Sequence, residues 1–304
     1  MKKIFKCFLL FVFATAYCLL TTICFSAGTT AGDFLAIGVG ARACGMGEAY
    51  SAVTDGANSV YWNPAGLIIK KGSEVTFSHL QYVSGIRLGD VAFCMPYKVG
   101  VLGVELNTLY TEDTRREAVT GNKTGDFMNY NAALTVAYSQ EVDKNIYLGA
   151  GLKGIYMKLD DTAAKGVGLD VGGLYKVNEK LKCGLVVQNI GTKIKFENDA
   201  ATPLSTNIRA GISYLINKSW IAALDGNMPF DGSKSASVGS EYYVVKYVAV
   251  RAGYKYRSGG NDLGGLDGLS AGLGLSIKSY SLDYAFVPFG EFDSTHRVSF
   301  GVKW

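Results

Sequence analysis

The sequence predicts an all-β protein, a 14-stranded antiparallel transmembrane β-barrel preceded by a small N-terminal hatch. Three observations lead to this fold class. Apolar and polar residues alternate with a period of two along most of the chain from residue 73 onward. The alternating segments number fourteen, an even number, as in single-chain bacterial outer-membrane barrels. The chain also begins with a stretch that is typical of exported proteins.

Residues 1–27 form the predicted signal peptide. Three lysines precede an apolar run from Cys7 to about Leu20, and small residues follow near the expected cleavage point. An uncleaved membrane anchor is the alternative, but no basic stop-transfer cluster follows the run. Removal of this segment would lower the formal net charge from +4 to +1, which gives no basis for a nucleic-acid partner.

Residues 28–72, called the hatch segment below, lack the alternating pattern. The stretch from Ile37 to Gly47 contains G-x-G-x-x-A, and Asp55 follows it, as in some dinucleotide-binding loops. That reading requires a strand, a helix and a βαβ unit, and no such alternation follows. We therefore expect the segment to plug the barrel, with a short helix over 47–53 and with glycines that let its backbone approach the wall closely.

Arg42 is the only charged residue in the stretch AIGVGARACGMG, residues 36–47. Inside a barrel its guanidinium would be buried, and a buried charge is tolerated only when it is paired and hydrogen-bonded. We therefore expect a carboxylate partner for Arg42.

Fourteen segments alternate between an apolar and a polar face. In 247–257, for example, Val248 and Val250 lie on one face while Arg251 and Lys255 lie on the other. Most segments reach the ~9–11 residues that a tilted strand needs to cross a membrane. The expected strands cover 73–83, 86–97, 99–111, 126–141, 145–160, 164–177, 181–190, 204–216, 219–227, 235–245, 247–257, 267–277, 280–288 and 294–304. In the fifth segment the apolar face changes near Gly154, which predicts a β-bulge.

The connections alternate between short and long along much of the chain. Outer-membrane barrels have short periplasmic turns and longer outer loops, so 112–125 and 191–203 are expected to be outer loops. A soluble β-sandwich also explains alternation, but it explains less well the two-faced pattern on nearly every strand. Each short turn carries one lysine, and these are Lys98, Lys144, Lys180, Lys218, Lys246 and Lys278.

The block FLAIGVGARACGMGEAYSAVTDGANSVYWNPAGL, residues 34–67, resembles the N-terminal signature of the PorV/PorQ family of outer-membrane proteins. Residues 186–214 and 294–304 resemble the same family, and the NPAG at Asn63–Gly66 resembles the hatch motif of FadL-like fatty-acid transporters. Cys44 stands where a small residue such as alanine is expected. The resemblance implies a FadL-like barrel over 73–304 with its hatch over 28–72. The hatch motif it implies consists of Gly38, Gly40, Arg42, Gly45, Met46, Gly47, Asn63, Pro64, Ala65 and Gly66.

Charged residues on the polar strand faces are candidates for lining the lumen. They could select a solute, or they could simply form a solvated and mutually paired interior, which is normal for this architecture. The candidates are Asp170, Arg209, Asp225, Glu241, Arg251, Lys255, Asp283 and Arg297.

No catalytic, cofactor or metal site is predicted. The only histidines are His79 and His296, and neither has a nucleophile and base arrangement beside it. The three cysteines beyond the signal peptide, Cys44, Cys94 and Cys183, are too few and too widely spaced for a disulfide framework or a zinc site.

Two functions remain open, beside a third option of a structural outer-membrane protein without transport. Family resemblance implies an outer-membrane component of type IX secretion that binds or shuttles exported proteins. The FadL-like hatch implies a channel for hydrophobic small molecules. A shuttle should be sealed by its hatch and bind cargo on outer loops, whereas a channel should contain an apolar pocket beside the hatch. In both cases we expect outer-membrane lipid around the barrel.

Overall fold

The structure is a computed structural model that describes residues 30–304 except 71, 83–84, 198–199, 260–265 and 290–293. The predicted signal peptide, residues 1–27, lies outside the described residues. Within the described part of the chain, no helix has the length and apolar character required to cross a membrane.

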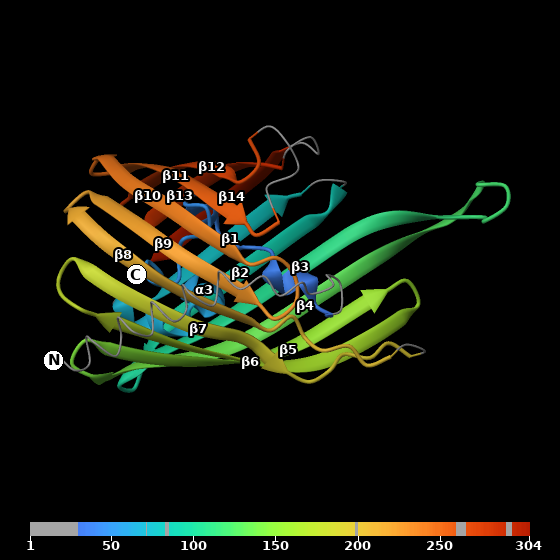
Figure 1. Ribbon diagram of the computed structural model, residues 1–304, viewed down its shortest axis with the longest axis horizontal. Coiled ribbons are helices and arrows are strands. Elements are labelled where there is room, and N and C mark those ends of the chain that lie inside the picture. The colour runs from blue at the N-terminus through green and yellow to red at the C-terminus, as the bar shows by residue number, and fades with distance from the viewer. Residues whose placement is uncertain (1–29, 71, 83–84, 198–199, 260–265, 290–293) are drawn as a thin grey trace.

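The fourteen predicted strands form one closed antiparallel barrel (Figure 1), so the predicted fold class is confirmed. Closure gives every strand two partners, because β1 pairs with both β2 and β14 and no sheet edge is left inside the membrane. The strands are β1 (Glu74–Gln81), β2 (Arg87–Tyr97), β3 (Gly100–Arg116), β4 (Lys123–Asp143), β5 (Ile146–Leu159), β6 (Thr162–Lys176), β7 (Leu181–Gly191), β8 (Asn207–Asn217), β9 (Trp220–Pro229), β10 (Ser235–Val245), β11 (Val248–Arg257), β12 (Leu269–Ile277), β13 (Tyr280–Pro288) and β14 (Ser294–Lys303).

The third and fourth strands are longer than predicted. Most of the expected loop 112–125 is a two-stranded hairpin, which Figure 1 shows projecting far beyond the barrel. β2 pairs with β3 only as far as Tyr110, and β5 pairs with β4 only from Tyr130 onward. Residues 111–129 therefore pair only with each other, and the expectation of a loop was wrong because polar residues hide the alternation there.

The predicted bulge at Gly154 is also wrong. The pairing of β5 with β4 and with β6 runs through Gly154 without a register shift. The inward position 155 carries an isoleucine that is buried against the hatch segment. An apolar residue on the inner face was therefore mistaken for a change of face.

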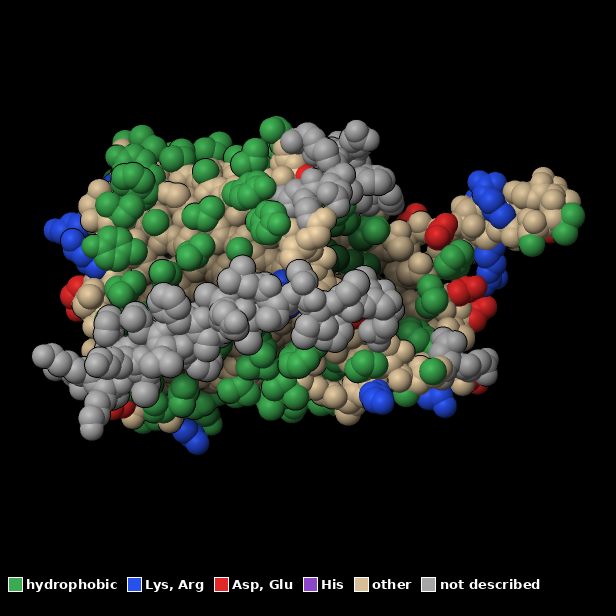
Figure 2. All heavy atoms as spheres, in the orientation of Figure 1, with side chains coloured by type: hydrophobic (Ala, Val, Ile, Leu, Met, Phe, Trp, Pro, Cys, Tyr) green, Lys and Arg blue, Asp and Glu red, His purple; other side chains and the backbone are tan. Residues whose placement is uncertain are grey.

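The outer surface of the barrel is a belt of exposed apolar side chains. Leu152 is 60% exposed and Leu273 is 56% exposed, and Figure 2 shows hydrophobic side chains covering the barrel wall between charged ends. Aromatic pairs such as Trp220–Tyr242 and Phe93–Trp304 lie near the short turns. This belt suits a lipid environment with aromatic residues at its border.

The hatch segment lies inside the barrel. It contains four short helical elements: η1 (Asp33–Ala36), α2 (Ala41–Gly45), α3 (Ser59–Trp62) and η2 (Pro64–Ile69). The helix expected over 47–53 is a series of turns instead, and the helix lies earlier, at α2. Trp62, Tyr50 and Met46 are among the largest fully buried side chains. The core of the molecule is therefore the contact between the hatch segment and the inner wall.

Candidate functional site

The ion-pair network around Arg42 fastens the hatch segment to the wall. As expected for a buried guanidinium, Arg42 has carboxylate partners: Nε and Nη2 each donate to Glu241 on β10 at 2.7 Å. Nη1 donates to Asp55 at 2.8 Å and to the Tyr50 hydroxyl at 3.1 Å. This two-pronged contact with Glu241 is the geometry that makes arginine–carboxylate pairs strong. Burial alone would raise the pKa of Asp55, but Arg42 and Lys70 hold it well below its usual range.

A second charged cluster surrounds Glu48. Its Oε2 accepts from Lys255 Nζ on β11 at 2.6 Å and lies 4.0 Å from Arg209 on β8. Arg209 also stacks over the Trp62 ring, 4.8 Å from its centroid. Burial alone would raise the pKa of the Glu48 carboxyl, but Lys255, Arg209 and Arg297 lower it to about 2. Glu48 is therefore ionised at neutral pH and attracts three wall cations.

Backbone groups of the hatch segment are also held by charged wall residues. Asp225 on β9 accepts from the amides of Tyr50 at 3.0 Å and Ser51 at 2.8 Å. Arg297 on β14 donates to the Gly38 carbonyl at 2.8 Å and to the Cys44 sulfur. These contacts satisfy polar groups that would otherwise be buried without a partner.

Five of the eight lumen candidates thus contact the hatch segment directly. Two act one step away, because Arg251 donates to both Glu241 and Asp283 at 2.7 Å. Asp170 pairs instead with Lys153 of the wall at 3.0 Å and accepts from the Asn189 amide at 2.7 Å. The expected mutual pairing is present for Arg251 and Asp170, but most of these charges bind the hatch segment, which was not expected.

The NPAG motif places Asn63 at the junction of α3 and η2. Its side-chain oxygen caps η2 by accepting from the Ala65 amide at 3.2 Å. Its side-chain amide donates to the carbonyls of Ser51 at 3.0 Å and Gly173 at 3.2 Å. The motif therefore joins two parts of the hatch segment to β6, and Ser139 on β4 adds a bond to the Ala65 carbonyl at 3.1 Å.

Glycines on the inner wall allow backbone-to-backbone contact with the hatch segment. A β-carbon added to Gly253 on β11 would lie 2.1 Å from the Gly47 nitrogen, and one on Gly149 of β5 would lie 2.4 Å from the Pro64 carbonyl carbon. Gly47 itself has a φ of 63°, in the left-handed region that glycine tolerates best. The glycine-rich stretch is thus fitted to wall backbone, and no βαβ unit surrounds it in the described residues.

Sequence reasoning missed several inward-facing acids. Asp90 on β2 and Glu105 on β3 are buried and interact directly, and neither Asp90 oxygen has a hydrogen-bond partner among the described residues. Glu48 and Asp55 of the hatch segment were also missed as anchors. The signal that could have found Asp90 and Glu105 is their position on the polar face of an alternating strand.

Histidines and cysteines take no visible part in chemistry. His296 bonds to the Tyr284 hydroxyl at 2.7 Å on the outer face, and His79 is exposed on β1. Cys44, Cys94 and Cys183 are free and buried. Among the described residues, no three histidine, cysteine or acidic side chains are placed to hold a metal ion.

An apolar recess of about 580 Å³ lies beside η1. The first part of the hatch segment, the inner faces of β3 to β5 and the segment between β7 and β8 form its walls. Its apolar lining includes Phe34, Ile37, Leu109, Met157, Ile194 and Phe196. The recess could accommodate a hydrophobic group of small-molecule size.

The sequence profile described as type IX secretion system protein PorV matches residues 25–223. The chain belongs to the PorV family. This PorV-family protein is accordingly an outer-membrane β-barrel associated with type IX secretion. No protein of curated function matches its sequence.

Solved structures with a similar fold are outer-membrane channels. The CymD monoaromatic hydrocarbon channel has a TM-score of 0.61 at 14% identity, covering 88% of this chain and 97% of CymD. The Pseudomonas putida toluene transporter TodX has a TM-score of 0.57 at 14% identity, covering 88% and 97%. A Pseudomonas aeruginosa FadL homologue has a TM-score of 0.58 at 12% identity, covering 88% and 98%. At these identities the likeness concerns the fold.

Proposed function

We propose that this PorV-family protein binds exported proteins at the outer face of the outer membrane while its hatch stays closed. The observation that carries the proposal is the way the hatch segment is fastened. Ion pairs to β10 and β11 and backbone contacts to β5 and β6 hold it from opposite sides of the barrel. Opening a passage would require several buried charge pairs to break together, which is costly.

The β3–β4 hairpin, residues 111–129, is the proposed cargo surface. It stands clear of the barrel (Figure 1), and its exposed residues are rich in charge of both signs (Figure 2). Arg115 forms ion pairs with Asp160 and Asp161 of the β5–β6 turn, which tie the hairpin to that neighbouring turn. Val119 at the tip is 92% exposed. A charged, raised surface with an exposed apolar tip suits recognition of another protein.

The test removes the hairpin and leaves the barrel. Residues 114–126 are replaced by Asn-Gly between Asp113 and Phe127, which are directly opposite each other, so that a two-residue turn reconnects the strands. Full-length protein and variant are purified from the native membrane, and bound proteins and lipids are identified by mass spectrometry. We expect secreted proteins with the full-length protein and their loss from the variant.

The matched control is Arg115→Ala with Arg116→Ala, which keeps the hairpin length but removes two charges. It should reduce cargo recovery partially and leave the heat-modifiable gel migration of the barrel unchanged. Equal recovery of secreted proteins from the hairpin deletion and the full-length protein would remove the hairpin from the proposal.

A channel for hydrophobic small molecules is the second candidate, and the apolar recess beside η1 favours it. A hydrophobic ligand there would contact Phe34 and Met157. In the same purification, a stoichiometric lipid or hydrophobic compound without any secreted protein would support uptake and contradict cargo binding.

Our proposal includes no enzymatic activity. The PorV family and the solved channels are secretion and transport components, and we assign no reaction to the hatch or the wall. Hydrolysis of phospholipid or peptide by the purified barrel, lost in a His296→Ala variant, would contradict this part.

A further inference from the structure

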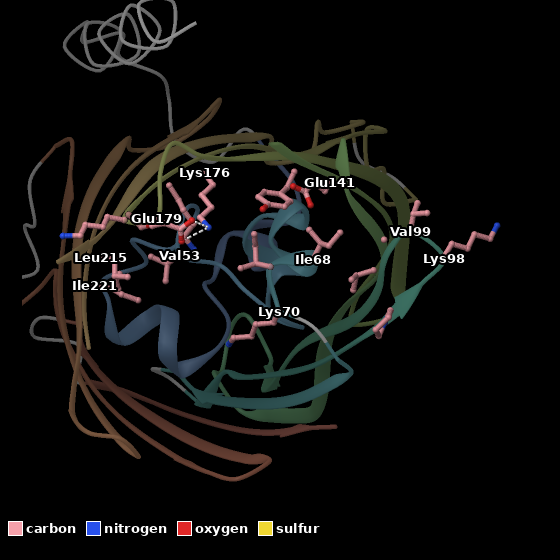
Figure 3. Close-up of a pocket in the computed structure, with 18 residues that line it drawn as sticks. Val53, Ile68, Lys70, Lys98, Val99, Glu141, Lys176, Glu179, Leu215 and Ile221 are labelled. Atoms are coloured by element: carbon pink, nitrogen blue, oxygen red, sulfur yellow. Dashed lines mark hydrogen bonds and ion pairs between the residues drawn. The ribbon is translucent and has the colours of Figure 1, made fainter. Parts of the chain in front are cut away.

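A separate recess opens at the end of the barrel opposite the β3–β4 hairpin. Its volume is about 780 Å³, within the ~300–1,000 Å³ range of ligand pockets. Figure 3 shows the recess inside the ring of strands, next to the hatch segment. Its rim includes the short β2–β3 and β6–β7 turns, and short turns mark the periplasmic end of such barrels.

The deeper surface of the recess is apolar. Ile68 and Ile69 of η2 and Val53 line it together with Ile221 at the start of β9. Ile68, Ile69 and Ile221 are only partly buried, so they present apolar surface to water inside the mouth. Covering this surface with an apolar side chain would be favourable because it removes apolar area from water.

The remainder of the lining is basic. Five lysines and two glutamates line the recess. Lys176 is paired with Glu179 at 3.0 Å and Lys70 with Asp55 at 2.6 Å, and Figure 3 shows both lysines extending into the space. The other three lysines are Lys98, Lys180 and Lys182, whose ammonium groups form no hydrogen bond or ion pair with any described residue.

Lys182 is the cation best placed to receive a ligand. It is partly buried at the start of β7, whereas Lys98 lies on the rim and points away from the space in Figure 3. Lys144, Lys218, Lys246 and Lys278 extend the basic rim along the other short turns and are exposed. Glu141 and Asp143 offset part of this charge, but the rim remains positive and would steer an acidic partner toward the mouth.

We propose that this periplasmic recess binds an acidic peptide segment of a periplasmic protein, with apolar side chains of the segment against η2. The unpaired lysines favour acidic residues in the peptide, and the apolar surface of η2 favours large apolar residues next to them. Val99 on the rim is 81% exposed and offers a further contact to a protein partner. The strands enclose the recess, which keeps lipid chains out. This site is distinct from the proposed cargo surface on the outer hairpin.

The recess also contacts the hatch segment on its periplasmic side, through η2. A segment seated on Ile68 and Ile69 would lie next to Lys70, whose partner Asp55 is also bonded to Arg42. Occupancy of the recess is therefore connected to the main ionic anchor of the hatch segment through two hydrogen bonds.

The test uses the full-length protein in nanodiscs of zwitterionic lipid and a short fluorescent peptide in which glutamate alternates with leucine. Empty nanodiscs correct for binding to lipid. We expect saturable binding that is at least about tenfold tighter than for a Lys-Leu peptide or a Glu-Ser peptide. The double variant Lys180→Gln with Lys182→Gln should weaken binding about tenfold. Lys246→Gln, a rim lysine outside the recess, should change it less than about twofold.

Both variants must show the heat-modifiable migration of the wild type. If the double variant fails this check, Lys180→Gln alone replaces it, because Lys180 lies in the β6–β7 turn and its substitution leaves the strands unchanged. Equal affinity in the double variant and the wild type would overturn the proposal. Displacement of the peptide by inorganic phosphate at low millimolar concentration would also overturn it, because the site would then be a simple anion site. Removal of the outer hairpin should leave this binding unchanged, so the two proposals fail independently.

Discussion

The two halves of the hatch segment are held in different ways. The first half, residues 30–55, meets β8 to β14 mainly through charges, including Arg42, Glu48 and Asp55. The second half, residues 56–70, meets β1 to β7 mainly through neutral hydrogen bonds such as that of Asn63. Close glycine contacts occur in both halves, at Gly47 against Gly253 and at Pro64 against Gly149. Charges tolerate small displacements of the wall, whereas backbone contacts require a fixed shape. The comparison predicts that loss of a charge affects the first half most, whereas glycine substitutions in the wall affect both halves.

Loss of the Arg42 side chain should have the largest effect. Arg42→Ala leaves Asp55 and Glu241 buried with fewer partners, and breaking a buried pair costs about 3–5 kcal/mol. We expect the hatch segment to loosen and ion conductance across planar bilayers to rise. Arg115→Ala, which breaks an exposed pair on the hairpin, should change stability by no more than about 1 kcal/mol. A wild-type conductance for Arg42→Ala would show that the ionic half is not what seals the barrel.

Glycine substitution tests the contacts made by backbone. Gly149→Ala would place a β-carbon 2.4 Å from the Pro64 carbonyl carbon, and overpacking of this kind costs about 1–3 kcal/mol. The control Gly154→Ala lies on the same strand, where an added β-carbon meets nothing within 4 Å. On a gel, the band of the folded barrel should disappear at a lower heating temperature for Gly149→Ala than for the wild type, and at the wild-type temperature for Gly154→Ala. Identical behaviour of the two would mean that the hatch segment can shift without cost.

Asp90 offers a stabilising change on the side of the wall formed by β1 to β7. Its carboxyl group faces Glu105 in a buried site, where burial and the neighbouring carboxyl group both disfavour ionisation. Asp90→Asn should raise stability by roughly 1–2 kcal/mol, measured by urea-induced unfolding in lipid vesicles. Asp283→Asn should do the reverse because that carboxylate is paired with Arg251. Destabilisation by Asp90→Asn would point to a bound cation or a required charge at this position.

Low pH should weaken the contacts of Glu48 with the wall. Because the folded pKa of Glu48 is about 2 against an ordinary value of 4.5, its contribution is fully present above pH 4.5. That contribution is lost as the pH falls from 4.5 toward 2. Proteolytic cleavage within the hatch segment should increase over this range and be less pH-dependent in Glu48→Gln. An equal pH dependence in the variant would assign the acid sensitivity to another carboxyl group.

The barrel was predictable from the sequence because period-two alternation is local. Strand β11, for instance, differs from its expected range by one residue at its start. The hairpin was not predictable, because Glu112 to Arg116 and Lys123 to Asp126 are polar on both faces and lack the lipid-facing pattern. Ile155 was misread because an inner wall packed against a hatch segment can be apolar.

The candidate site was predictable in its residues but only partly in its contacts. A buried Arg42 requires a carboxylate, and that expectation follows from elementary electrostatics. The choice of Glu241, which lies 199 residues away along the chain, depends on barrel closure and on the depth of α2. Periodicity gives the face on which a side chain lies, but it does not give its height along the barrel axis.

The seam between β1 and β14 has a consequence for biogenesis. It joins residues 74–81 to residues 294–303. The hatch segment is synthesised before β1, but the barrel can enclose it only after the last strand has been made. Its ionic partners on β8 to β14 also emerge only after the first seven strands. Contacts of such long sequence separation form slowly. We therefore expect an assembly stage in which Arg42, Glu48 and Asp55 are still hydrated, followed by their dehydration when the seam closes.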